Sequence, residues 1–396
     1  MQGAQGLRIL EITWEYPPHI VGGLGRHVYN LSVHLASKGA EVTVLSFTDG
    51  TSKKQERSEG VEIVRVNPYV LRYPDFVSWI EGLNMLMVER AADLGSFDLI
   101  HVHDWLTAYS GIALKHMWRR PLVATIHATE IGRRKVLTND SERHIHEMEW
   151  WLAFEAWRVI CCSKYMMKEV HSSLGCPADK ISVIHNGYDP KMAKAKNAEP
   201  GRKSGKTVLF VGRLVYEKGP HLLVEAASLL REEEGLRVII VGDGAMRPYL
   251  EGLARKLNLG DKVSFLGHVD DETLLSIYEE ASVLVIPSLY EPFGIVVLEA
   301  MSLGIPVIVS NTGGLDEIVT DGKDGIKFQS GSAEDLAKAI TRVLHNEGLK
   351  ARLVVNAKSR ANEFSWSNTA EQTLELYKRV LDEYNANDWK PKAGIR

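Results

Sequence analysis

The chain has 396 residues, which is more than one ordinary core needs and suits two domains of roughly 100–200 residues each. Its 47 basic residues nearly balance 51 acidic ones, so the whole-chain charge gives no indication of a nucleic-acid-binding or strongly anionic-membrane-binding protein. Three cysteines without disulfide or metal-ligand spacing, no leader-like start and no run of ~20 apolar residues together predict a cytoplasmic protein without stable membrane insertion.

Short apolar runs rich in β-branched residues recur through the first half of the chain, and helix-length stretches separate them. Runs of this kind, bounded by turn residues, are typical of buried parallel strands. We predict strands at residues 7–12, 41–47, 61–66, 98–102, 122–126, 159–162 and 181–184. The alternation of strand and helix indicates a doubly wound α/β domain, in which ligands bind beyond the carboxyl ends of the strands.

A glycine-rich loop with Gly22, Gly23 and Gly25 follows the first predicted strand and precedes a helix with apolar residues at helical spacing. Glycine lets a ligand approach the backbone closely, and a helix N-terminus offers unpaired N–H groups, so the loop suits a phosphate. A tight turn that requires glycine is an equally open explanation. A nicotinamide-binding loop is disfavoured, because Val28 stands where G-x-G-x-x-G requires its third glycine.

Two histidine pairs in the first half, His101 with His103 and His144 with His146, have the spacing of metal ligands. Neither pair has companion ligands at a recognisable distance in the sequence. We therefore interpret these residues as structural histidines and predict no metal site.

An aromatic stripe follows, in which Trp150, Trp151, Phe154 and Trp157 repeat at helical spacing. Such rings could stack on a flat or ring-shaped ligand. Because their spacing is that of the core-facing side of a helix, we expect them to be buried instead.

Residues 187–205 are poor in bulky apolar groups and rich in Lys, Pro and Gly, which indicates a domain boundary. A second series of apolar runs follows and predicts strands at residues 207–211, 237–241, 262–266, 282–286 and 306–309. We therefore predict an α/β domain at residues 1–190, a second at 191–367 and a C-terminal helical segment at 368–396.

Two cations, Arg213 and Lys218, lie directly after the apolar run 207–211 and before a helix that starts near Pro220. A solvated loop pair is the ordinary explanation for an Arg and a Lys taken at random. Their position at the end of a buried strand favours a ligand pocket instead. Fixed cations there suit the phosphates of a nucleoside diphosphate.

An acid, Glu299, lies inside an otherwise apolar helix, after the apolar residues 295–298. An unpaired carboxylate buried there would be strongly destabilising, so Glu299 needs partners. Ribose hydroxyls would supply two donors, and an internal Arg or Lys is the structural alternative. Glu291 precedes the same helix and can point toward a ligand, while the N–H groups of Gly294 and Ile295 remain for phosphate oxygens.

Taken together, these motifs are similar to those of the family 4 retaining glycosyltransferases, which have the GT-B fold. The motifs are GRLVYEKG at 212–219, EPFG at 291–294 with Glu299, the glycine loop, HVHDW at 101–105, TIH at 125–127 and Asn186-Gly187. The resemblance covers essentially the whole chain. It implies two Rossmann-like, doubly wound domains that face each other across a cleft, with the last helix crossing back to the first domain.

The resemblance also implies site residues. A catalytic group would comprise Arg213, Lys218, Glu291, His127 and Asp104. A donor-binding group would comprise Gly22, Gly23, Gly212, His268, Tyr290, Phe293, Gly294, Ile295 and Glu299. The two cations would hold the donor diphosphate, Glu291 the sugar and Glu299 the ribose. His127 and Asp104 would lie beside the sugar, the glycine loop would cover the phosphates, and the backbone near His268 would meet the base.

The HDW and TIH motifs most resemble those of the glycogen and starch synthases. We therefore expect this protein to transfer glucose from UDP- or ADP-glucose to the non-reducing end of an α-1,4-glucan, with retention of the anomeric configuration. Ile20 stands where bacterial glycogen synthases carry a lysine, which leaves the donor nucleotide open among UDP, ADP and GDP. A lipid, small-sugar or phosphosugar acceptor is the alternative, and a non-catalytic sugar-binding protein is a third.

The expected partners are a nucleotide sugar and a carbohydrate acceptor, and nucleic acid is not among them. We expect no cofactor and no metal, because Arg and Lys can stabilise the departing diphosphate electrostatically. The sequence also lacks the Asp-x-Asp pair of metal-dependent transferases.

Overall fold

A computed structural model describes residues 6–70, 72–188 and 206–389. The chain divides into two compact units: unit 1 comprises Met1–Asn186 with Trp366–Arg396, and unit 2 comprises Gly187–Ser365. Most of the predicted linker, residues 189–205, lies outside the described residues. The division falls four residues before the predicted boundary at 190/191 and two residues before the one at 367/368.

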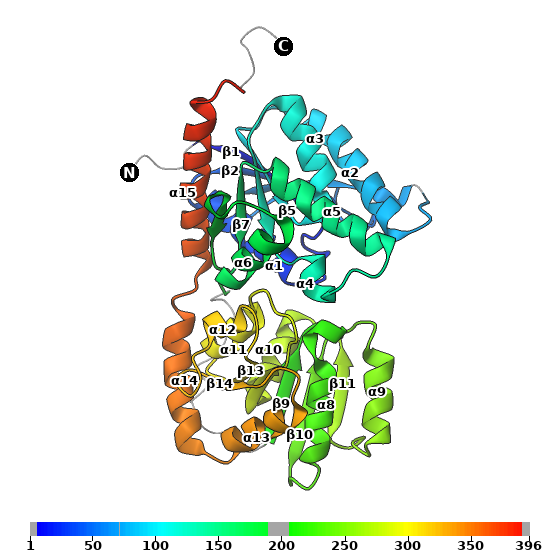
Figure 1. Cartoon of the computed structure of the whole chain (residues 1–396), viewed down its shortest axis with the longest axis vertical. Coiled ribbons are helices and arrows are strands. Elements are labelled where there is room, and N and C mark those ends of the chain that lie inside the picture. The colour runs from blue at the N-terminus through cyan, green and yellow to red at the C-terminus, as the bar shows by residue number, and fades with distance from the viewer. Residues whose placement is uncertain (1–5, 71, 189–205, 390–396) are drawn as a thin grey trace. The chain divides into compact units, whose positions relative to one another are not determined.

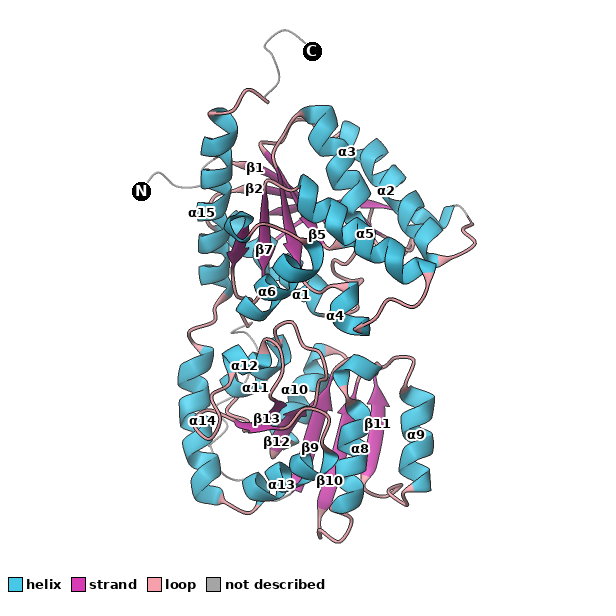
Figure 2. Cartoon of the chain, in the orientation of Figure 1, coloured by secondary structure: helices cyan, strands magenta, loops and turns pink. Residues whose placement is uncertain are grey.

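Unit 1 is built on one sheet with helices on both sides (Figures 1 and 2). The strand order is β3-β4-β2-β1-β5-β6-β7-β8, and all neighbours are parallel except β3 and β4. The strands are β1 (Arg8–Ile12), β2 (Glu41–Phe47), β3 (Gln55–Ser58), β4 (Val61–Val66), β5 (Leu99–His103), β6 (Leu122–Ile126), β7 (Arg158–Cys161) and β8 (Ile181–Val183). The α-helices are α1 (Gly23–Ser37), α2 (Phe76–Ala92), α3 (Ala108–Trp118), α4 (Glu130–Arg134), α5 (Asp140–Glu155), α6 (Lys164–Leu174) and α15 (Trp366–Asn385).

The seven strands predicted for this half are present within one residue at either end. Strand β3 was not predicted, because its sequence Gln-Glu-Arg-Ser is polar and it lies exposed at the edge of the sheet, where no apolar pattern is required. The aromatic stripe prediction is wrong for two rings of α5. Trp150 and Phe154 are 48% and 65% exposed, and they stack on each other with centroids 5.5 Å apart.

Helix α15 belongs to unit 1 although 179 residues of unit 2 separate it from the rest. Its buried residues Leu374, Tyr377 and Val380 join the same apolar cluster as Leu31 and Leu35 of α1. The apolar face of α15 is thus part of the core of unit 1.

Unit 2 has a wholly parallel sheet in the order β11-β10-β9-β12-β13-β14. The strands are β9 (Lys206–Val211), β10 (Leu236–Val241), β11 (Val263–Gly267), β12 (Val283–Ile286), β13 (Val307–Ser310) and β14 (Ile326–Phe328). The α-helices are α8 (Pro220–Leu229), α9 (Arg247–Lys256), α10 (Asp271–Glu280), α11 (Ile295–Ser302), α12 (Leu315–Ile318), α13 (Ala333–Leu344) and α14 (Glu347–Ala361). Strand β14 was not predicted, because three residues are too few to show a pattern.

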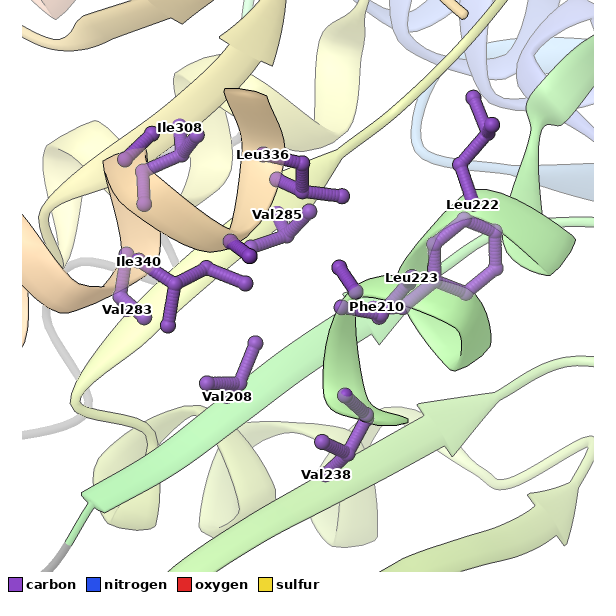
Figure 3. Packing of buried hydrophobic residues seen from close by; sticks show 14 of the residues in the cluster. Val208, Phe210, Leu222, Leu223, Val238, Val283, Val285, Ile308, Leu336 and Ile340 are labelled. Atoms are coloured by element: carbon purple, nitrogen blue, oxygen red, sulfur yellow. The ribbon is translucent and has the colours of Figure 1, made fainter. Parts of the chain in front are cut away.

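The core of unit 2 lies between its sheet and the helices that cover it (Figure 3). Val208 and Phe210 of β9 and Val285 of β12 are buried with Leu223 of α8 and Leu336 of α13. Both faces of such a parallel sheet are covered, which explains why the strand sequences are continuous apolar runs.

Each sheet has a point where the strand order reverses. In unit 1 the chain moves outward from β1 to one side and then starts the other side at β5; in unit 2 the same reversal separates β9 from β12. Ligands of doubly wound sheets bind at the carboxyl ends of the strands that flank this point. Among the residues that the structure describes, no helix combines the length and apolarity that crossing a bilayer requires.

Candidate active site

The predicted cations of unit 2 lie at the reversal point of its sheet. Arg213 follows β9, and Lys218 ends a short 3-10 helix, η4 (Tyr216–Lys218). Gly219 has φ +64°, and a Cβ there would lie 2.0 Å from the carbonyl oxygen of Pro287. Glycine is therefore required, because the loop that carries Lys218 is pressed against the loop that follows β12.

That close approach brings Lys218 to Glu291. The Lys218 Nζ lies 2.8 Å from both carboxylate oxygens of Glu291, and the Ser288 hydroxyl donates to Oε2 at 3.1 Å. The Gly314 N–H donates to the backbone carbonyl of Glu291 at 2.8 Å. Glu291 is thus held through both its side chain and its backbone. Sequence reasoning missed Ser288 and Gly314, whose only signal was their place after strands at the same sheet edge.

Arg213 supplies a second, more accessible cation. Its side chain is 45% exposed, and its Nη2 lies 3.8 Å from Glu217 Oε1. Because β9 and β12 are neighbours, the structure brings Arg213, Lys218 and Glu291 to the same edge of the sheet. Two cations and a carboxylate there can bind a diphosphate and a polar group attached to it.

Helix α11 starts next to these residues. Gly294, at φ +112°, precedes the first helical residue, Ile295. Glu299 lies one turn further on and is 2% exposed, and the Tyr278 hydroxyl of α10 donates to its Oε2 at 3.3 Å. The predicted burial of Glu299 is confirmed. Tyr278 is a partner that was not predicted, since it comes from a different helix.

The remaining predicted donor residues of unit 2 have different surroundings. Tyr290 and Phe293 are both 3% exposed, and the Phe293 ring packs edge-on against Phe364 at 6.0 Å. The Gly212 N–H donates to a backbone carbonyl of β10. His268 is exposed and follows β11, two strands away from β9, so it lies at the same sheet edge without adjoining the cations.

In unit 1 the glycine loop already holds an anion from within the chain. One carboxylate oxygen of Glu15 accepts hydrogen bonds from the N–H groups of Val21, Gly22 and Gly25 at 2.8, 2.9 and 3.3 Å. A Cβ on Gly25 would lie 2.9 Å from that oxygen. The N–H of Gly22, predicted to cover phosphate with Gly23, is therefore engaged by Glu15 in this structure. Sequence reasoning missed Glu15, whose signal was an acid after the first strand.

Asp104 and His127 lie on neighbouring strand ends. They follow β5 and β6, and the His127 N–H donates to Asp104 Oδ1 at 2.7 Å. Burial raises the pKa of Asp104 to about 6, against the opposing charge of Arg133 and its own hydrogen bonds. Burial lowers the pKa of His127 to about 3, so its imidazole is neutral near pH 7. A neutral imidazole can both donate and accept a hydrogen bond, as recognition of a hydroxyl requires.

The two histidines of the first pair differ in how many of their ring nitrogens have partners. His101 bonds Thr125 Oγ1 at 2.7 Å and the Tyr377 hydroxyl at 2.6 Å. His103 Nδ1 lies 3.3 Å from His127 Nε2, whereas its Nε2 has no hydrogen-bond partner among the described residues. His103 is therefore a buried polar group that is only partly satisfied.

Comparisons with known proteins agree on a family. The model described as "Glycosyltransferase Family 4" matches residues 21–192, and "Glycosyl transferases group 1" matches residues 192–360. A glycosyltransferase of Methanocaldococcus jannaschii, described as uncharacterized, is 40% identical over 95% of this chain and 99% of its own length. This chain is a family 4 glycosyltransferase.

Two further relatives of this family 4 glycosyltransferase carry names of different enzymes. A glycogen synthase of Mycobacterium tuberculosis is 36% identical over 94% of both chains. A D-inositol 3-phosphate glycosyltransferase of Nocardia farcinica is 32% identical over 94% of this chain and 87% of its own length. Among solved structures, sucrose-phosphate synthase of Thermosynechococcus elongatus superposes with a TM-score of 0.81 at 28% identity, covering 95% of this chain and 100% of the other.

The predicted GT-B class, with two Rossmann-like domains built on parallel sheets, is confirmed by this structural neighbour. In this family 4 glycosyltransferase the candidate residues lie at the carboxyl edge of each sheet, and His268 is set apart from the cations by β10. The candidate residues of unit 2 are fixed cations and carboxylates, and those of unit 1 are a glycine loop, a carboxyl group and neutral imidazoles. Enzyme activity as a glycosyltransferase is thereby established, whereas the donor and acceptor must be inferred.

Proposed function

We propose that this family 4 glycosyltransferase transfers glucose from UDP- or ADP-glucose to the non-reducing end of an α-1,4-glucan. The observation that carries the proposal is the contact of Lys218 with Glu291, with Arg213 at the same edge of the sheet, after β9 and β12. Cations at this point suit a diphosphate, and a carboxylate beside them suits the hydroxyls of the attached sugar. The relationship to a glycogen synthase over 94% of both chains favours a glucan acceptor.

The chemistry follows from the charges that develop. As the anomeric C–O bond breaks, positive charge grows on the sugar and negative charge on the departing diphosphate. Arg213 and Lys218 stabilise the latter, without a metal ion. A phosphate oxygen of the leaving group takes the proton of the incoming hydroxyl on the same face of the sugar, so the anomeric configuration is retained.

The other residues bind and orient. Glu291 accepts hydrogen bonds from sugar hydroxyls, and Glu299 accepts from the ribose. The resemblance assigns His127 and Asp104 to the sugar and the Gly22-Gly23 loop to the phosphates. For the loop to do so, Glu15 must release the Gly22 N–H that it now holds. The backbone near His268 is assigned to the base, which would extend the donor along the sheet edge past β10.

A phosphosugar acceptor is the second candidate. It is favoured by the relationship to D-inositol 3-phosphate glycosyltransferases, whose 32% identity extends over 94% of this chain. The cytoplasmic location also remains a proposal, supported by three buried cysteines that are all free thiols.

One assay decides among these candidates. The protein is incubated with UDP-, ADP- or GDP-glucose, alone and with glycogen, maltooligosaccharides or inositol phosphate, and released nucleotide and sugar products are quantified. Growth of the glucan with UDP or ADP release supports the proposal. Product only with inositol phosphate supports the second candidate. If no combination gives either donor hydrolysis or sugar transfer, the protein is not a glucosyltransferase.

A further inference from the structure

Three imidazoles meet at the carboxyl edge of the sheet in unit 1. His27 lies one turn into α1, His103 ends β5 and His127 follows β6. One ring nitrogen of each lies within 4.8 Å of those of the other two. His27 and His103 are buried and His127 is half-buried, so the cluster can be reached from the side of His127.

His27 is oriented in the manner of a metal ligand. Its Nδ1 lies 2.7 Å from the amide oxygen of Asn186, which can only accept a hydrogen bond, so Nδ1 carries the proton. The lone pair is therefore on Nε2, which is buried and has no hydrogen-bond partner among the described residues. Histidine ligands commonly donate their other N–H to an oxygen in this way, which fixes the ring and its tautomer.

The other two nitrogens have the spacing of a ligand pair. His103 Nδ1 and His127 Nε2 are 3.3 Å apart. Two nitrogens on a tetrahedral zinc ion, each about 2.0–2.1 Å from the metal, are separated by about 3.3–3.4 Å. Burial also holds all three imidazoles neutral by lowering their pKa values, and neutral imidazole is the form that binds metals.

A carboxyl group adjoins the cluster. Glu11 is fully buried, and neither of its oxygens has a hydrogen-bond partner among the described residues. Glu11 forms a second possible ligand group with His101 and His103, so His103 is common to both groups. The Glu11 carboxyl is thus a further possible oxygen ligand near His103.

We propose that His27, His103 and His127 bind a divalent transition-metal ion of the zinc type. Imidazole ligands select such ions over magnesium and calcium, which prefer oxygen. A bound ion would occupy His127, and we therefore expect it to inhibit sugar transfer. Only this inhibition rests on the proposed function; metal binding does not.

The test uses the full chain after removal of metal by a chelator. Zn²⁺ is titrated by calorimetry without donor or acceptor, and Co²⁺ is added to record its visible spectrum. We expect one equivalent of Zn²⁺, the intense Co²⁺ absorption of tetrahedral coordination and no binding of Mg²⁺. Binding should weaken at least tenfold in His103→Gln, and about 10–100-fold in Asn186→Ala, which removes the acceptor of the His27 N–H. His116→Gln, exposed on α3, is the matched control and should bind as the unmodified protein does.

A measurement on the unmodified protein guards against variants that fail to fold. With ¹⁵N-labelled histidine, Zn²⁺ should shift the ring nitrogens of three of the 14 histidines. Absence of stoichiometric binding, shifts confined to other histidines, or unchanged affinity in folded His103→Gln would overturn the inference. Zinc binding by a protein that transfers no sugar would refute the proposed function alone, and transfer without zinc binding would refute this inference alone.

Discussion

The ion pair of Lys218 and Glu291 is held in a fixed position before any ligand binds. The pair is largely buried, with 21% and 11% of the two side chains exposed, and Ser288 adds a hydrogen bond to the carboxylate. A cation already held in place needs little reorganisation when negative charge develops beside it. Arg213 is less constrained, because its nearest carboxylate oxygen is 3.8 Å away.

We expect Lys218→Ala and Arg213→Ala each to lower kcat by a factor on the order of 10²–10³, as loss of one charge-stabilising group usually does. Steady-state kinetics of nucleotide release measure this. Lys327→Ala is the control, because it also removes an ion pair of unit 2, with Asp316, but on the edge strand β14. A loss below about tenfold in both site variants, or an equal loss in the control, would refute the leaving-group role.

Ionisation of Glu11 would destabilise the folded protein, because its carboxyl group is buried. Burial raises its pKa from the ordinary 4.5 to about 8, so the native state keeps a proton that the unfolded chain releases. Its contribution to stability is present in full below pH 4.5 and is lost as the pH rises to about 8. Burial shifts the pKa values of the nearby histidines in the opposite direction, because it lowers them.

Comparison with Glu11→Gln isolates this contribution. We expect the free energy of unfolding of the original protein, relative to the variant, to fall between pH 4.5 and about 8, by up to about 1.4 kcal/mol per pH unit. Urea denaturation at a series of pH values measures the difference. A difference that stays constant over this window would show that Glu11 is ionised in the native state.

Among the elements, α15 connects the C-terminal segment to the sheet of unit 1. The Tyr377 hydroxyl lies 2.6 Å from His101 Nδ1, and the Trp157 indole N–H donates to Glu383 at 2.9 Å. Both tyrosine and histidine are buried, so this contact is formed away from water. The helix is therefore held by polar contacts in addition to its apolar face.

Tyr377→Phe keeps the ring and removes only the hydroxyl. We expect it to destabilise the protein by about 1–3 kcal/mol, because His101 loses a buried hydrogen-bond partner. The free energy of unfolding in urea measures the loss. Tyr216→Phe, at a residue 66% exposed, should have little effect, and equal stability of both variants would contradict the proposed role of this bond.

At the scale of the whole molecule, the two units differ in how the chain builds them. Unit 2 is one continuous segment, whereas unit 1 combines Met1–Asn186 with Trp366–Arg396. Deleting the chain after Ser365 would expose the apolar residues that Leu374, Tyr377 and Val380 cover. Unit 1 thus depends on a segment made after unit 2.

We expect the truncated chain, residues 1–365, to retain a folded unit 2 and to lose the cooperative unfolding of unit 1. Differential scanning calorimetry should show one transition missing, and limited proteolysis should degrade residues before 186 first. If the truncated chain keeps both transitions, the core contribution of α15 is smaller than its burial indicates.

Much of the site was predictable from sequence. Arg213, Lys218 and Glu291 follow apolar runs, and carboxyl ends of neighbouring parallel strands meet at one edge. Glu299 could be recognised because its apolar neighbours imply burial. Tyr278 and Ser288 could not, because hydrogen bonds between separate elements leave no periodic signal. The exposure of Trp150 and Phe154 was also missed, since helical spacing does not say whether the apolar side finds a covering element.

The sequence by itself determined the α/β class, the strands with apolar patterns, the cations at strand ends and the family resemblance, because these depend on local composition and spacing. Only the tertiary structure decided that Glu15 holds the glycine loop, that Lys218 pairs with Glu291, and that His27, His103 and His127 converge. The Glu15 contact depends on the fold of one loop, whereas the other contacts join residues 24 to 100 positions apart, which the order and register of the strands bring within bonding distance.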